Sequence, residues 1–184
     1  MTGAPLVVLD ACVLANFSLC DTLLRLAEPP QLFEPKWSEE IIRETTRTLE
    51  LKVGWPSSLT AHFENELRAH FSEAWISDYE SLIPKMTNDE RDRHVVAAAV
   101  RGEAAIILTL NLRHFRPEHL AMWGVRALHP QSLLIEIFRQ EQAVVLTKLD
   151  QQATDRGRSL SQLLDILNAT APDFVSLVSA AISR

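Results

Sequence analysis

The chain has 184 residues and a net charge of −6, with 47% hydrophobic and 23% charged residues. This length allows one ordinary domain with an appendage, and the composition is that of a soluble globular protein. The apolar runs are shorter than a membrane span, and the N-terminus lacks the features of a signal peptide, so we expect a cytoplasmic protein. The negative charge argues against broad, nonspecific binding to nucleic acid.

Two features of the composition bear on ligands. Residues 91–129 contain six arginines and four histidines but only three acids, so we expect a local basic surface within an acidic protein. Cys12 and Cys20, the two cysteines, lie eight residues apart in one hydrophobic segment. They lack the spacing of a metal-binding pair, and we expect both to be buried, reduced thiols.

The first part of the chain predicts a strand and three helices. Leu6–Leu9 is a short continuous apolar run, which is typical of a central parallel strand covered on both faces. The hydrophobic segment 12–27 predicts a helix that ends before Pro29-Pro30. Ser38 is placed to cap a helix to about residue 52, and apolar residues spaced by four predict another helix over residues 59–71.

The next part predicts one helix and two strands. A cap within residues 87–89 begins a helix to about residue 101, and Gly102 stands where a C-cap glycine belongs. Apolar runs at residues 104–110 and 125–128 are further candidates for buried strands. Helices that alternate with short apolar strands indicate an α/β domain with a mostly parallel sheet.

This α/β domain is expected to close near residue 130. Beyond Pro130 the pattern is helical, with a capping-box pair at Ser159 and Gln162. We therefore expect a domain over residues 1–130 and a helical extension over residues 131–184, which packs on the domain or on a partner and does not carry catalysis.

Asp10 ends the first predicted strand. In parallel α/β sheets, ligands bind at the carboxyl ends of the strands, and Asp10 is at such an end. The nearest basic residue along the chain is Arg25, so a local salt bridge does not explain this acid. A simple loop or cap aspartate is the alternative.

Glu44 is the second candidate acid. With residues placed at 100° steps, it falls at the edge of the buried face of its helix, whereas Glu40 falls further out. A glutamate at the rim of a buried face needs a partner, since an unpaired buried charge is costly. Arg47 or Lys52 on the same helix is the simple alternative to a functional partner.

Asp92 is the third candidate acid, and it shares a helical stripe with apolar residues. The favourable helix dipole explains Asp89 and Glu90 in the first turn better than it explains Asp92. Three acids from separate segments against hydrophobic surface would repel one another. A hard divalent cation removes this conflict, and Mg²⁺ and Mn²⁺ prefer carboxylate oxygens. Such a site can activate water and stabilise charge on a phosphoryl group.

The chain resembles the PIN-domain ribonucleases, especially the VapC-like toxins of toxin–antitoxin pairs. The resemblance covers about residues 5–130 and rests on four motifs in order: VVLDACVL, WSEEIIRETTRTL, TNDERDRHVVAAAV and IILTLNLRHF. It implies a PIN-like, Rossmann-like three-layer α/β/α fold with a short, mostly parallel sheet. It also implies metal-dependent hydrolysis of RNA phosphodiester bonds.

The resemblance assigns roles to particular residues. It implies that Asp10, Glu44 and Asp92 are the catalytic residues and hold Mg²⁺ or Mn²⁺, with Thr109 and Asn111 in support. Glu40 competes for the role of Glu44. The family often has a fourth acid where this chain has Asn111, an amide without charge, so the site is expected to rest on three carboxylates.

The resemblance also implies partners: an RNA substrate, a cognate antitoxin and a second copy in a homodimer. Arg91, Arg93, Arg113 and Arg116 are candidate contacts to the RNA backbone, although a solvated side chain is the favoured explanation of each one taken alone. Arg113 is the best candidate, because it directly follows the site loop. His94 and His114 either face RNA, support the carboxylates or lie on the surface.

The residues around Asp10 exclude three other classes of protein in which an aspartate follows a strand or a ligand binds there. A dehalogenase-type phosphatase needs an aspartate at the position of Cys12, dinucleotide binding needs a glycine-rich turn, and a receiver domain needs acids before Asp10. Two alternatives stay open. One is a PIN fold that has lost catalysis and acts as an interaction module, and the other is cleavage of DNA.

Overall fold

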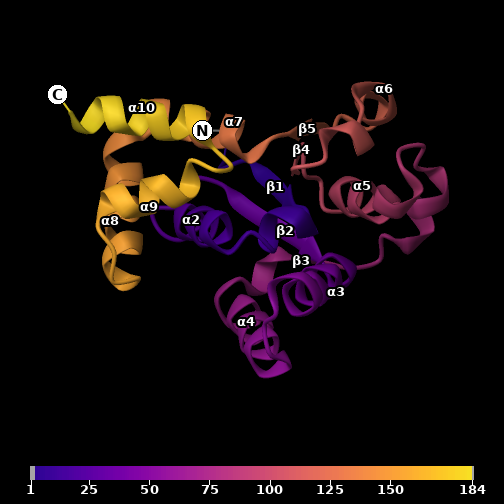
Figure 1. Cartoon of the computed structure of the whole chain (residues 1–184). Helices are drawn as coiled ribbons and strands as arrows, with labels where there is room; N and C mark the ends of the chain where they lie inside the picture. Colours follow the sequence, from indigo (N-terminus) through magenta and orange to yellow (C-terminus); the bar gives the residue numbers. More distant parts are fainter. Residues whose placement is uncertain (1–2, 184) are drawn as a thin grey trace. The chain divides into compact units, whose positions relative to one another are not determined.

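The computed structural model describes residues 3–183 (Figure 1), and the chain divides into two compact units. The first unit consists of Met1–Ala15 and Phe33–Leu128. The second unit consists of Asn16–Leu32 and His129–Arg184. Residues 16–32 thus belong with the C-terminal helices. That residues 131–184 act as a separate extension stays a prediction.

The first unit is built on a five-stranded sheet in the order β3-β2-β1-β4-β5, and every paired strand is parallel. Its central strand is buried, with Val7, Val8 and Leu9 fully inaccessible to solvent, as the apolar run predicts. Parallel strands place all their carboxyl ends at one edge. The strands are β1 Leu6–Leu9, β2 Glu34–Ser38, β3 Trp75–Ile76, β4 Ile106–Leu108 and β5 Arg126–Leu128.

Helices flank this sheet, which confirms the predicted PIN-like α/β/α fold (Figure 1). Ser38 caps α3, as expected, because its Oγ accepts a hydrogen bond from the backbone N–H of Ile41. The α-helix ends at Thr48 and continues as a π-helical turn to Val53. The helices are α1 Ala11–Leu14, α3 Glu39–Thr48, α4 Ser57–His70, α5 Arg93–Arg101 and α6 Pro117–Leu120.

The helix α5 packs across β2, β1 and β4 and carries Asp92 at its start. Asp89 caps the 3-10 turn Glu90–Asp92 that leads into it. Gly102 follows the helix with φ −85°, so it does not supply the left-handed cap that glycine usually provides. A Cβ at Gly102 would lie 2.6 Å from Cδ1 of Ile76, so close packing against β3 explains this glycine.

The helix predicted over residues 12–27 is two helices in the structure. The first helix, α1, ends at Leu14, and α2 Phe17–Ala27 begins in the second unit. The break has a local cause, because the side chain of Asn16 accepts a hydrogen bond from the N–H of Leu19 and so starts a new helix.

The second unit is helical, as predicted for the chain beyond Pro130. Phe138 and Phe174 meet edge to face in its core, with ring centroids 6.0 Å apart. The predicted capping box of Ser159 and Gln162 is present. No helix within the described residues is long and apolar enough to cross a membrane. Its helices are α2, α7 Pro130–Gln140, α8 Gln142–Asp155, α9 Leu160–Leu167 and α10 Pro172–Ile182.

A buried polar contact joins α2 to α8. The hydroxyl of Thr22 lies 2.8 Å from Oε1 of Gln152, and Gln152 Nε2 donates to the carbonyl of Ser18. Both side chains are almost fully buried, so the pair ties the early helix to the late ones by bonds that water cannot replace.

Thr22→Val is therefore expected to lower the free energy of unfolding by about 1–3 kcal/mol, because it leaves a buried amide oxygen without its donor. Urea denaturation followed by circular dichroism measures the change. Thr147→Val is the control, since Thr147 is exposed and its hydroxyl donates to the carbonyl of Ala143 in its own helix. Equal stability of the two variants would show that the buried contact contributes nothing.

Candidate active site

The carboxyl ends of β1 and β4 bring Asp10 and Thr109 together. Asp10 follows β1, and its backbone N–H donates to the carbonyl of Leu108 at the end of β4. The hydroxyl of Thr109 donates to Oδ2 of Asp10 at 2.7 Å. Asp10 is 4% exposed and Thr109 is fully buried. The sheet therefore holds this carboxylate in a fixed orientation at its ligand-binding edge.

Cys12 completes the support of Asp10. Its thiol donates to the same Oδ2 at 3.1 Å, while its sulfur accepts from the N–H of Leu110 at 3.3 Å. Burial, reinforced by the charge of Asp10, raises the pKa of Cys12 to about 12. The thiol therefore keeps its proton at neutral pH and can donate it. Both cysteines are free, as expected, although Cys12 is only half-buried while Cys20 is buried.

Asp92 lies at the start of α5, next to His114 from the segment after β4. Its Oδ2 is 2.7 Å from Nδ1 of His114. Burial raises the pKa of Asp92 above its ordinary value, and the negative charge of Asp10 adds to this effect, whereas the bond to His114 opposes it. The influence of Asp10 shows that the structure brings two of the three predicted acids into one electrostatic environment.

Asp89 and His114 place further atoms that could bind a metal next to the carboxylate of Asp92. One ligand atom from each of these three residues lies within 4.8 Å of the others, which is close enough for one cation. The two carboxylates suit a hard divalent ion such as Mg²⁺ or Mn²⁺, whereas both ring nitrogens of His114 already make hydrogen bonds, to Asp92 and Arg113. Asp89 and His114 were not among the predicted ligands.

Glu44 on α3 lies next to His94 in the first turn of α5. Its Oε1 lies 3.3 Å from Nε2 of His94, two residues after Asp92. His94 is buried, and within residues 3–183 neither of its ring nitrogens makes a hydrogen bond of good geometry, so this contact is one of proximity. The carboxylate of Glu44 is 41% exposed and open to a ligand. Its neighbour Glu40 instead pairs with Arg43 on the helix surface.

Asn111 occupies the loop after β4. Its backbone N–H donates to the hydroxyl oxygen of Thr109 at 3.0 Å, which orients that hydroxyl toward Asp10. The side chain of Asn111 is exposed. Asn111 thus contacts Thr109 through its backbone, and the supporting role predicted for its side chain stays a prediction.

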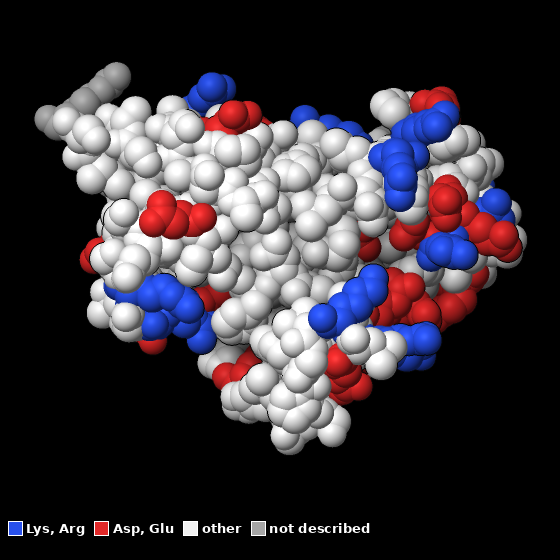
Figure 2. All heavy atoms as spheres, in the orientation of Figure 1, with Lys and Arg blue, Asp and Glu red and all other residues white. Residues whose placement is uncertain are grey.

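The candidate RNA contacts lie around this site, in segments of mixed charge. Arg91 and Arg113 are exposed, and Arg93 donates to the backbone carbonyl of Asn88. Arg113 donates through Nε to Nε2 of His114 at 3.2 Å. On the face shown in Figure 2, lysine and arginine side chains of the first unit stand among aspartate and glutamate side chains.

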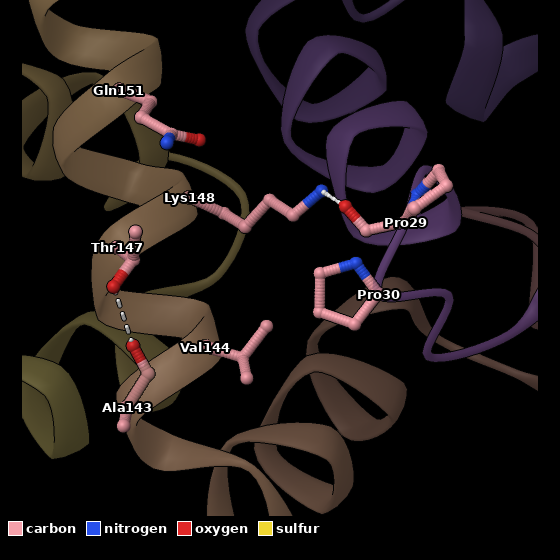
Figure 3. Close-up of a pocket in the computed structure, with 7 residues that line it drawn as sticks. All are labelled: Pro29, Pro30, Ala143, Val144, Thr147, Lys148 and Gln151. Atoms are coloured by element: carbon pink, nitrogen blue, oxygen red, sulfur yellow. Dashed lines mark hydrogen bonds between the residues drawn. The ribbon is translucent and has the colours of Figure 1, made fainter.

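A separate hollow lies in the second unit (Figure 3). It has a volume of about 300 Å³, and Lys148 reaches across it to donate to the carbonyls of Glu28 and Pro29. None of the seven residues drawn in Figure 3 is acidic, so this hollow does not offer the carboxylates that a divalent cation needs.

A parallel sheet flanked by helices, with carboxylates gathered at its carboxyl edge, defines a PIN-like α/β/α protein with a candidate metal site. Among curated proteins, the chain is 34% identical over 106 residues to a protein of Mycobacterium tuberculosis (strain ATCC 25618 / H37Rv) named "Putative ribonuclease VapC50". This similarity confirms the resemblance to VapC-like proteins. No family model and no solved structure matches the chain.

The similarity covers part of each protein: 56% of this chain and 63% of the relative. Since the chain spans less than two thirds of that relative's length, what the relative's name says of its activity applies to this chain only as a proposal.

Asp92→Asn is expected to raise the free energy of unfolding of the metal-free protein at neutral pH. The raised pKa means that the folded state disfavours the ionised carboxylate. This penalty is complete above the raised pKa and absent below the ordinary value of 3.8, so the advantage of the asparagine variant should disappear as the pH falls toward 3.8.

Denaturation in EDTA across this pH range measures the effect. Asp150→Asn, at an exposed position on α8, is the control that should show no such pH dependence. An Asp92→Asn protein that is less stable than the parent at neutral pH would contradict the electrostatic account.

Proposed function

We propose that this protein is a divalent-metal-dependent endoribonuclease that acts as the toxin of a toxin–antitoxin pair. The observation that carries the proposal is the buried carboxylate of Asp10, held by Thr109 and Cys12 at the carboxyl edge of a parallel sheet. A carboxylate is costly to bury, and one that is hydrogen-bonded through a single oxygen at the ligand-binding edge of a parallel sheet leaves its other oxygen for a cation. The name of the VapC-like relative supports hydrolysis of RNA.

The residues of the site have two proposed roles, binding the metal ion and positioning its ligands. Asp10, Glu44 and Asp92 would hold Mg²⁺ or Mn²⁺, with Asp89 and His114 next to Asp92. The ion, when bound, supplies an activated water and neutralises charge on the phosphoryl group. Thr109 and Cys12 keep Asp10 aimed at the ion by donating to one of its oxygens, and Asn111 fixes the Thr109 hydroxyl.

The substrate and partners follow from the same likeness. An RNA strand would lie along the edge of the site, with Arg91, Arg93 and Arg113 contacting its phosphates. The cognate antitoxin and a second copy of the chain are the proposed protein partners. Such an enzyme would meet its RNA in the cytoplasm.

A second candidate is a PIN-fold interaction module without catalysis. The uncharged Asn111 and the net charge of −6 favour this alternative. A module has no need to bind a divalent cation at three acids, so metal titration separates the two functions.

Purified protein is expected to cleave labelled RNA in the presence of Mn²⁺ or Mg²⁺ and to stop in EDTA. Asp10→Asn, Glu44→Gln and Asp92→Asn should each reduce turnover by about a hundredfold or more, because each removes a carboxylate from the ion or the reacting water. Glu40→Gln is the matched control for Glu44→Gln, since Glu40 lies on the same helix and pairs with Arg43.

The outcomes separate the hypotheses. Unchanged turnover in one of the three acid variants would remove that residue from the site. Folded protein that neither cleaves RNA nor binds metal would favour the interaction module. Protein that binds metal at the three acids but leaves a given RNA intact would point to a different RNA substrate.

A further inference from the structure

His114 makes hydrogen bonds with both of its ring nitrogens. Nδ1 lies 2.7 Å from Oδ2 of Asp92, and Nε2 lies 3.2 Å from Nε of Arg113. The histidine is half-buried, in the 3-10 turn Leu112–His114 that follows β4. It therefore links an exposed arginine to one of the proposed metal-binding carboxylates.

These two bonds fix where the ring carries its proton. An arginine Nε–H is only a donor, so Nε2 of His114 must accept and must itself be without a proton. A neutral imidazole then carries its proton on Nδ1. Nδ1–H consequently donates to Asp92, and the direction of both hydrogen bonds follows from the chemistry of the arginine.

We propose that His114 is a positioning residue for Asp92, held in the Nδ1–H tautomer by Arg113. By engaging Oδ2, it turns Oδ1 of Asp92 toward the cation. The inference rests on the proposed function, because it gives Asp92 its role as a metal ligand. The sequence left three roles open for His114, and the two hydrogen bonds select support of a carboxylate.

The chemistry of metal sites supports this arrangement. Carboxylate ligands are commonly hydrogen-bonded by an outer partner that sets their orientation, and loss of such a partner typically costs 10–100-fold in metal affinity or activity. Thr109 and Cys12 orient Asp10 in this way. His114 is the corresponding donor for Asp92.

Arg113 can hold the ring and contact substrate together. Its guanidinium has five N–H donors, of which the bond to His114 uses only the one on Nε. The remaining donors suit a phosphate oxygen of RNA. A phosphate bound there would restrain Arg113 against the ring and so stabilise the tautomer that orients Asp92.

Long-range ¹H–¹⁵N correlation spectra of the ¹⁵N-labelled full-length protein, recorded without metal at neutral pH or above, read the tautomer directly. We expect the signal of His114 to show a protonated Nδ1 and an unprotonated Nε2. His114→Asn assigns the signal by its disappearance. A proton on Nε2 in the parent protein would overturn the proposal.

Mn²⁺ binding, measured by calorimetry on full-length variants, tests the positioning itself. His114→Leu should weaken the affinity 10–100-fold. Asparagine presents an amide N–H near the place of Nδ1, so His114→Asn should restore the affinity to within about threefold, whereas His114→Gln, whose amide lies near the place of Nε2, should not. His119→Leu is the control, because His119 bonds instead to the side chain of Thr87.

Two results would contradict the proposal: His114→Leu protein that binds Mn²⁺ as tightly as the parent, or direct nitrogen ligation of Mn²⁺ that pulsed electron paramagnetic resonance detects in the parent and loses in His114→Leu. The second result would make His114 a ligand. Neither measurement needs RNA. Failure of RNA cleavage would therefore bear only on the proposed function and its substrate, and it would leave the tautomer of His114 and its effect on Asp92 standing.

Discussion

The buried carboxylate of Asp10 is the constraint on which the site depends. A nearly inaccessible aspartate is tolerable only where donors replace the water it has lost. Thr109 and Cys12 provide them, and both reach Asp10 only because β1 and β4 are adjacent parallel strands that end at the same level. The adjacency of β1 and β4, and the backbone bond from Asn111 to Thr109, together hold this carboxylate in place.

Around this fixed acid the structure arranges two contacts between a carboxylate and an imidazole. Asp92 meets His114 and Glu44 meets His94, and the two acids come from different helices. The contact with His114 engages one oxygen of Asp92 and leaves the other for a cation. This arrangement departs from a purely acidic site, since Asn111 contributes no charge and imidazoles stand close to two of the three predicted acids.

Several elements escaped prediction for identifiable reasons. The strand β2 contains Pro35 and Lys36, which weaken the apolar pattern of a strand. Proline cannot donate a backbone hydrogen bond, but β3 pairs with β2 at Trp37 and Ser38, beyond Pro35, so the missing N–H of Pro35 costs no bond to β3. The break at Asn16 lies within one continuous hydrophobic segment, where only the cap geometry divides α1 from α2. The association of α2 with the C-terminal helices depends on contacts such as that of Thr22 with Gln152, far apart in sequence.

The sequence by itself determined the α/β class, the buried central strand, the helical C-terminal part and the acids Asp10, Glu44 and Asp92 as candidates, because apolar periodicity and residue type are local properties. Tertiary structure decided which groups surround each acid. The sequence left three roles open for His94 and His114, and only the fold placed each of them against an acid. No spacing encodes a 2.7 Å contact between Asp92 and His114 across 22 positions. Hydrogen-bond direction at His114 depends on three side chains at once, which only the folded chain brings together.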